Sequence, residues 1–141
     1  MSQQPQHSTP KAAPGPVRLS DALAGFDRLW SPHVLARVND HEVRIAKVGG
    51  DHVWHAHDTT DEFFLVLSGE LRIGLRQDGA ERTVVLGEGA SFVVPRGVEH
   101  RPSAPEGAAI MMVEAAGTLS VGDRHEEVPD HVDATTGHPL A

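Results

Sequence analysis

The chain has 141 residues, no cysteine and a formal net charge of −8 at pH 7. This length fits one domain that can bury its own core. The absence of cysteine excludes disulfide scaffolds, thiolate metal sites and cysteine nucleophiles. The 12 basic residues are scattered singly among 20 acidic ones, which argues against a nucleic-acid groove or an anionic membrane surface.

The sequence gives no indication of a secretory signal at its start or of a membrane-spanning helix. No stretch approaches the roughly 18 consecutive apolar residues of a membrane-spanning helix. The opening "MSQQPQHSTPKAAPGPV" lacks the apolar core of a secretory signal. We therefore expect a cytoplasmic protein whose partner is a small molecule.

The first 32 residues of the chain divide into a tail and a short lead-in. Residues 1–16 are rich in Pro, Gln and Ser, and they predict a disordered tail because they have too few apolar groups to offset the entropy of ordering. The next stretch, "LSDALAGFDRLW" (19–30), carries apolar residues near helical spacing, with Ser20 as a possible N-cap. This pattern predicts a short helix or an irregular lead-in that ends at Pro32.

From residue 33 onward the pattern is that of strands. Short apolar runs are bounded by Gly, Pro or Asp, in the order "HVLARV", "EVRIAKV", "FFLVLS", "ELRIGLR", "RTVVLG", "SFVVP" and "AIMMVEA". The Asp78-Gly79 pair indicates a type I′ hairpin turn. Seven or eight strands with short turns predict an all-β antiparallel sandwich or barrel over residues 17–120. The polar composition that follows predicts a tail over residues 121–141.

Metal-binding residue types are concentrated in "HVWHAHDTTDEFF", residues 52–64. On an extended strand His55 and His57 point to the same face, because they are two residues apart. Glu62 follows after a polar turn that can bring its carboxylate beside the two rings. His100 comes much later, after a strand and a Pro-x-Gly turn. Three imidazoles and one carboxylate form a ligand set that leaves open positions on an octahedral metal.

These spacings resemble the two motifs of the cupin superfamily, in particular its small single-domain, mannose-6-phosphate-isomerase-like members. The first motif is matched by Gly49-x₅-His55-x-His57-x₄-Glu62-x₆-Gly69, and the second by Gly89-x₅-Pro95-x-Gly97-x₂-His100. The resemblance covers residues 33–116, with the core motifs at 49–104. One position departs from the second motif, which often closes with Asn where this chain has Ala104.

The resemblance implies a double-stranded β-helix, or jelly-roll barrel, in which His55, His57, Glu62 and His100 hold one divalent metal ion per chain. Fe, Mn, Ni and Zn all suit such a ligand set, and the sequence does not choose among them. The motif glycines are expected where the chain reverses, with backbone angles that other residues rarely adopt; they are Gly49, Gly69, Gly89 and Gly97.

Residues around the motif have less specific interpretations. His52 is out of register and is expected at the rim or surface, as are His41, His125, His131 and His138. Asp58 and Asp61 are expected to solvate the turn or to hold a ligand imidazole by its second nitrogen. A single His-x-His is by itself more often a solvent-exposed pair than a metal site.

Two residues are candidates for substrate binding. Phe64 shares the parity of Glu62, so it is expected to face the interior, either as core or as a substrate contact. Lys47 shares a face with Val43 and Ile45, which predicts that it points inward and could meet a substrate anion. The alternative for Lys47 is that its ammonium reaches the solvent at the rim.

Two functions remain open from the sequence. The first is a metal-dependent enzyme acting on a small polar substrate by dioxygenase, isomerase, decarboxylase or lyase chemistry, for which no general acid or base can be assigned. The alternative is a non-catalytic module that binds or senses a sugar or small acid. A homodimer is also expected, because the edge strands of such sheets have to be covered.

Overall fold

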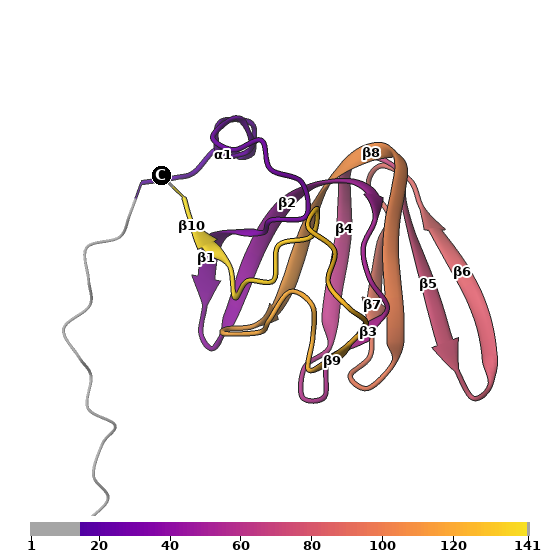
Figure 1. Ribbon diagram of the computed structural model, residues 1–141. Helices are drawn as coiled ribbons and strands as arrows, with labels where there is room; N and C mark the ends of the chain where they lie inside the picture. The colour runs from indigo at the N-terminus through magenta and orange to yellow at the C-terminus, as the bar shows by residue number, and fades with distance from the viewer. Residues whose placement is uncertain (1–14, 141) are drawn as a thin grey trace, which may run out of the picture.

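The computed structural model describes residues 15–140, so nearly all of the predicted tail over residues 1–16 lies outside the described residues. Within that range the chain forms one short helix and two groups of strands (Figure 1). No helix among these residues is long and apolar enough to cross a membrane. The elements are α1 (Leu19–Ala24), β1 (His33–Val38), β2 (His41–Asp51), β3 (His55–Ala56), β4 (Glu62–Gly69), β5 (Leu71–Gln77), β6 (Ala80–Leu86), β7 (Ser91–Val94), β8 (Glu99–Ala115), β9 (Arg124–His125) and β10 (His138–Pro139).

One long strand, β8, connects the two groups. Its C-terminal half lies between β2 and β4, with residues 108–113 paired to both. Its N-terminal half pairs with β5 over residues 99–103 and meets β3 at His100. β7 pairs with β4 at the outer side of one group, and β6 pairs with β5 at the outer side of the other. The predicted all-β fold is therefore the fold observed.

The predicted strands agree with the observed ones except in β8 and the short strands β3, β9 and β10. The sequence pattern predicted only residues 109–115 of β8, because Pro102 and Pro105 lack the backbone N–H of a regular strand. The predicted type I′ hairpin joins β5 to β6, with positive φ at both Asp78 and Gly79. The helix begins at Leu19, so its N-cap is Arg18, and the predicted cap Ser20 lies inside the first turn.

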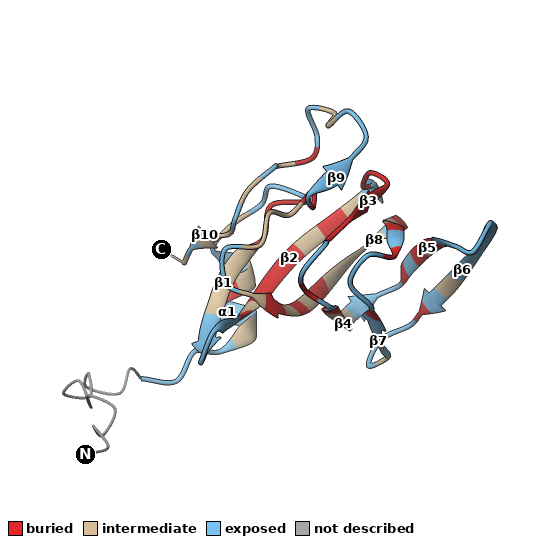
Figure 2. Cartoon of the chain, turned by 90° about the horizontal axis from the view of Figure 1, so that it is seen from below, coloured by how far each residue is buried: buried red, intermediate tan, exposed pale blue. Residues whose placement is uncertain are grey.

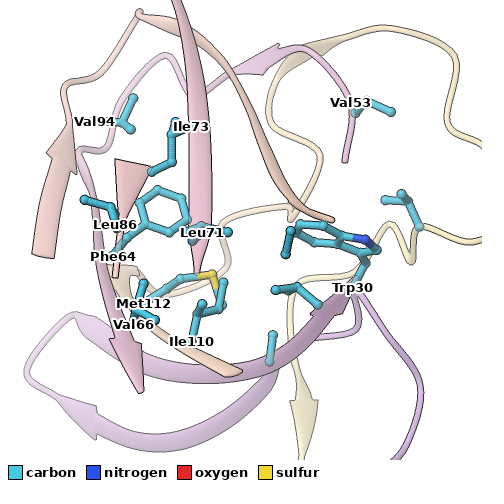
Figure 3. Packing of buried hydrophobic residues seen from close by; sticks show 14 of the residues in the cluster. Trp30, Val53, Phe64, Val66, Leu71, Ile73, Leu86, Val94, Ile110 and Met112 are labelled. Carbon is cyan, nitrogen blue, oxygen red and sulfur yellow. The ribbon is translucent and has the colours of Figure 1, made fainter. Parts of the chain in front are cut away.

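The apolar core lies between the two groups of strands. Phe64, Ile110 and Met112 face one another there, while Trp30 lies at the opposite side of the view in Figure 3. In Figure 2 the buried residues run along β2 and the strands beside it, whereas β6 and β9 are mostly exposed. The fold thus concentrates its buried surface where β2, β4 and β8 lie side by side.

The inward face of β2 differs from the predicted one. Glu42, Arg44, Ala46 and Val48 are all buried, and the last two line the internal cavity described below. Ile45 is also fully buried, but on the opposite face, which the N-terminal segment covers through a bridge between Leu29 and Lys47. Because both faces of β2 are covered, the presence of an apolar residue such as Ile45 does not show which face of the strand points into the interior.

The C-terminal segment packs against the body of the domain, in contrast to the predicted polar tail. It pairs with β3 through β9 and with β1 through β10 (Figure 1). Val121 and Val132 are buried in the core cluster. Asp133 fixes the segment, since it accepts hydrogen bonds from Ser31 Oγ at 2.7 Å and His138 Nε2 at 2.6 Å. Val121, Val132 and Asp133 thus help to dock a segment of polar composition.

The motif glycines follow the expectation at three of four positions. Gly69, Gly89 and Gly97 have positive φ, whereas in the first part of the motif Gly50 has positive φ instead of Gly49. Gly69 is also sterically confined, because a Cβ there would lie 2.4 Å from the carbonyl oxygen of Gly107. This close approach joins the end of β4 to the bend of β8.

We expect Gly69→Ala to lower the free energy of unfolding by about 1–3 kcal/mol, since the new Cβ meets backbone atoms and φ is unfavourable for alanine. Urea denaturation measures this change. Gly87→Ala is the matched control, because a Cβ at Gly87 would meet nothing within 4 Å. Equal stability of the two variants would contradict the steric assignment.

Candidate metal centre

Four side chains from three parts of the chain converge inside the domain. His55 lies on β3 and is paired directly with His100 of β8, while Glu62 begins β4. One potential ligand atom from each of His55, His57, Glu62 and His100 lies within 4.8 Å of the others. All four side chains are buried. The structure therefore brings together the four residues that the sequence singled out, and this group could hold a metal ion.

The turn that precedes His100 is fastened to the loop that carries His57. Gly97 N donates to the backbone carbonyl of His57 at 2.7 Å. The neighbouring Arg96 N donates to Asp61 Oδ1 at 2.8 Å. These two hydrogen bonds join the first and second motifs, so the relative positions of the imidazoles are set by the backbone as well as by side-chain packing.

Backbone carbonyls orient two of the imidazoles. His55 Nδ1 lies 2.8 Å from the carbonyl oxygen of Val53, and His100 Nδ1 lies 2.9 Å from that of Val98. A carbonyl oxygen only accepts hydrogen bonds, so Nδ1 carries the proton in both rings. Their Nε2 atoms are left with lone pairs that face the centre of the group, as metal-ligating histidines require.

In this arrangement the contact between His100 and Glu62 is unfavourable if the His100 ring is neutral. His100 Nε2 lies 3.2 Å from Glu62 Oε1, although in the neutral Nδ1–H tautomer both atoms present lone pairs. A cation between the two atoms would remove this repulsion. The same Glu62 oxygen lies 3.3 Å from His57 Nε2.

His57 provides a second sign of a missing partner. Within the described part of the chain, neither of its ring nitrogens has a hydrogen-bond partner, although both are buried. Burial of an unsatisfied polar group costs about 1–3 kcal/mol. A metal ion at the centre of the group would satisfy one of these nitrogens and the lone pairs of the other three ligands, so the residues fit such an ion.

Electrostatics within the group point in the same direction. Burial lowers the pKa of His55 well below its ordinary value, and the neighbouring His100 and His52 lower it further. Burial alone would raise the pKa of Glu62, but the contacts with His100 and His57 hold that pKa well below its usual range. A neutral imidazole and an ionised carboxylate are the forms that bind divalent ions.

For His57, in contrast to His55, the net shift of the pKa is upward. Burial lowers its pKa, but the charge and proximity of Glu62 outweigh burial, so the pKa is raised. In the chain without a cation, the proton on His57 is thus one way to compensate the Glu62 charge. A divalent ion would compete with that proton, which makes metal binding dependent on pH.

A buried charged network adjoins the four residues. Arg44 Nη1 donates to Glu114 Oε1 at 2.8 Å, and Arg44 Nη2 donates to Glu42 Oε1 at 2.8 Å. Two buried carboxyl groups, those of Glu42 and Glu114, thus pair with one buried guanidinium, and Glu114 in turn lies beside Glu62. Burial and the charge of Glu62 raise the pKa of Glu114 well above its ordinary value, although Arg44 opposes this shift. Sequence reasoning missed this network, because it assigned the opposite face of β2 to the interior.

A small internal cavity of about 30 Å³ adjoins the group, with room for about two water molecules. His55 and Glu62 contribute to its wall, and so do Phe64 and Glu114. Trp30 closes it from the side of the lead-in, held by a hydrogen bond from its Nε1 to the carbonyl of Gly49 at 2.7 Å. Its full lining is Trp30, Pro32, Ala46, Val48, His52, His55, Glu62, Phe64, Pro102, Ile110, Met112, Glu114 and Ser120.

The two substrate-binding candidates have different positions. Phe64 lies on the cavity wall beside His100, as its parity predicted. Lys47 does not reach the cavity; its Nζ donates to the carbonyl of Phe26 at 2.8 Å on the outer face of β2. The prediction that Lys47 points inward was wrong, because the alternating face that enters the interior is that of Glu42 and Arg44.

Other residues near the motif divide between expected and unexpected positions. His52 is buried and lines the cavity, instead of lying at the rim. Asp58 and Asp61 are exposed at the turn, the first of the two alternatives predicted for them; among the described residues Asp58 pairs with Arg124, and Asp61 accepts a hydrogen bond from Arg96 N. His41, His125 and His131 are exposed as expected, while His138 is partly buried against Asp133.

Because burial lowers the pKa of His52 to about 4, folding should weaken as the pH falls. Between that value and the unfolded pKa near 6.5, the unfolded chain binds a proton that the folded chain does not. We expect the metal-free wild type to lose about 2 kcal/mol more unfolding free energy than His52→Gln between pH 7 and pH 5. Urea titrations at both pH values measure this difference. Parallel pH profiles of the two proteins would contradict the burial of a neutral His52.

Comparisons with known proteins agree with the geometry. The model of the cupin domain family matches residues 41–121. An uncharacterised protein of Bacillus subtilis, YdbB, is 42% identical over 87 residues, which cover 60% of this chain and 74% of that protein. The crystal structure of a cupin-2 domain protein from Shewanella frigidimarina has a TM-score of 0.66 and 39% identity, covering 70% of this chain and 93% of that one.

A relative with a named activity is also found. The 3-hydroxyanthranilate 3,4-dioxygenase of Burkholderia lata is 36% identical over 90 residues, which cover 62% of this chain. The match spans about half of that enzyme, 52% of its length. The family match, the shared fold and the four converging ligands lead to one conclusion: the chain belongs to the cupin family.

Proposed function

We propose that the protein is a divalent-metal-dependent cupin enzyme, with His55, His57, Glu62 and His100 as the metal ligands, and that its reaction is of the dioxygenase type. The observation that carries the proposal is the convergence of four buried ligand atoms within 4.8 Å of one another. When bound, a divalent ion would supply Lewis acidity at this position, and Fe or Mn would add redox chemistry with O₂.

The rest of the site supports a reaction on a small molecule. The cavity lies directly beside Glu62 and His55, so a substrate held there would lie next to the metal ligands. Trp30 and Ser120 of the C-terminal segment contribute to the wall of this cavity, most of which is apolar. The small size of the cavity restricts the substrate to a compact molecule, or requires the C-terminal segment to move.

Dioxygenase chemistry takes precedence over isomerase chemistry because of the curated relative from Burkholderia lata. That protein is named as a dioxygenase and shares 36% identity over the aligned region. Because only about half of the length of that relative is matched, only the type of reaction, dioxygenation, is taken from its name for this proposal. The substrate of this chain is not taken from that relative.

We expect His55→Ala combined with His100→Ala to abolish most metal binding, because two of four ligands are removed from a site that cannot rearrange. Elemental analysis after exposure to Fe, Mn, Ni or Zn and desalting measures bound metal per chain. His125→Ala, an exposed histidine on β9, is the matched control. If the double variant retains as much metal as the control, the ligand assignment is wrong.

Metal addition is also expected to stabilise the fold. An ion that binds only the folded chain stabilises it by about 2.7 kcal/mol at a free concentration one hundred times its dissociation constant. A rise in the thermal midpoint of the wild type on metal addition, absent from the double variant, would support the site. The same rise in both proteins would place the ion elsewhere.

Turnover tests the enzymatic part of the proposal. The iron-loaded chain is incubated under air with aminophenols, diketones, keto acids and sugar phosphates, while O₂ uptake and product formation are followed. We expect O₂ uptake with at least one oxygen-bearing substrate and none in the double variant. Turnover without O₂ uptake would favour isomerase chemistry.

A second function is favoured by one specific observation, the small size of the cavity. A barrel with such a cavity could capture a small sugar or acid without converting it. Ligand binding without consumption across the same compounds would favour this non-catalytic module. The expected homodimer stays a prediction, to be tested by analytical ultracentrifugation.

A further inference from the structure

The strand that carries the first proposed metal ligand, β3, is only two residues long and has a partner strand on each edge. On one edge His55 pairs with His100 of β8, and on the other edge both residues of β3 pair with β9 (Figure 2). A strand of this length has few hydrogen bonds of its own, so its position depends on its two neighbours. The second neighbour lies beyond residue 121, where the match to the cupin domain family ends.

Residues 122–126, here called the β3 clamp, bond to the outer edge of β3 and its flanking residues. Asp123 N donates to the carbonyl oxygen of Ala56 at 2.9 Å, and Glu126 N donates to that of Trp54 at 3.1 Å. Trp54 N donates in return to Glu126 Oε1 at 3.1 Å. The outer edge of this strand is therefore occupied by backbone and side-chain partners from the C-terminal segment.

The same clamp reaches the residue that follows His57. Asp58 N donates to Asp123 Oδ2 at 2.7 Å, and Arg124 Nη2 lies 2.9 Å from Asp58 Oδ1. On the opposite edge, the carbonyl oxygen of His57 accepts from Gly97 N at 2.7 Å. The short segment that carries both histidines of the first motif is thus held between the second motif on one side and the β3 clamp on the other.

Gly122 brings the backbone of the clamp into direct contact with β3. It is buried and has a φ of +73°. A Cβ at this position would lie 2.5 Å from the carbonyl oxygen of Ala56 and 3.1 Å from Cδ2 of the His55 ring. Glycine meets both requirements, the positive φ and the absence of a side chain. The edge of one proposed metal ligand is therefore packed directly against the clamp.

We propose, on the basis of the metal centre proposed above, that the β3 clamp is a positioning element that sets the metal affinity of the site. It holds His55 and His57 at the distances from the other two ligands that one ion requires. The four ligand atoms lie within 4.8 Å of one another, so a small displacement of β3 separates two of them from the rest. Groups that orient metal ligands from outside change metal affinity by about 10–100-fold when they are removed.

Two glycines that follow β8 provide a matched test. Gly122 and Gly117 both have positive φ, at +73° and +82°, but a Cβ at Gly117 would meet nothing within 4 Å. Gly122→Ala and Gly117→Ala therefore share the backbone strain, and only the first displaces β3. The affinity of each full-length variant for cobalt(II) is measured by competition with a chelator, and the visible absorption of the bound ion reports its coordination.

We expect Gly122→Ala to bind cobalt(II) about tenfold more weakly than the wild type, with an altered visible spectrum, because β3 no longer fits between its neighbours. Gly117→Ala should keep the wild-type affinity and spectrum. The thermal midpoints of the metal-free variants measure the shared strain separately from metal binding. Equal cobalt affinities in the two variants would overturn the proposal.

A side-chain truncation tests the clamp without adding bulk. Asp123→Ala removes the acceptor of Asp58 N at an exposed position, and we expect a loss of cobalt affinity of about tenfold. Asp123→Asn keeps an acceptor oxygen and should restore the affinity. Asp130→Ala removes the same charge at another exposed position of the segment and should match the wild type. Wild-type affinity in Asp123→Ala, or the same loss in either control, would contradict the positioning role.

A metal-free measurement separates failure of the clamp from failure of the metal centre. If the wild type binds no cobalt, the metal centre fails, and the nuclear Overhauser contact between the rings of His55 and His100, whose centroids lie 4.2 Å apart, decides whether the clamp positions His55. Loss of this contact in Gly122→Ala, with retention in Gly117→Ala, supports the clamp, and an equal contact in both refutes it. If Gly122→Ala does not fold, Asp123→Ala and Asp123→Asn decide by the same readouts.

Discussion

The convergence of two imidazole nitrogens on a single carboxylate oxygen is the constraint on which the rest of the site depends. Glu62 Oε1 lies 3.2 Å from His100 Nε2 and 3.3 Å from His57 Nε2, inside a shell of buried groups. The backbone carbonyls of Val53 and Val98 fix the tautomers of His55 and His100. With the tautomers fixed, nitrogen lone pairs and the Glu62 carboxylate face one another at the centre of the group. Protons or a metal ion have to supply positive charge there.

The four ligands could be named from the sequence because their spacings resemble the two cupin motifs, whereas strand alternation alone indicated only that His55 and His57 share a face. The Asp78-Gly79 turn could be predicted from local rules, since its backbone angles are available to few residue pairs. Local rules of this kind carry over directly from sequence to structure.

The parts that could not be predicted depend on contacts between distant segments. On β2 both faces are covered, so apolar residues on the outer face concealed the inward-facing Glu42 and Arg44. The partner that compensates Arg44 is Glu114, some 70 residues later, and nothing local marks it. In the C-terminal segment Val121 and Val132 are too sparse to produce a periodic signal, yet both complete the core. In each case the stabilising partner is supplied by another strand.

The position of Trp30 gives this chain a built-in optical probe. The sequence contains two tryptophans and no tyrosine, so its near-ultraviolet fluorescence comes from two indoles in unlike surroundings. Trp30 lies edge-on to His52 with ring centroids 5.1 Å apart, at the cavity wall. Trp54 is stacked beneath the Arg76 guanidinium at 3.7 Å and does not line that cavity. Emission from the first indole, with the second as an internal reference, therefore follows events in the interior without any added label.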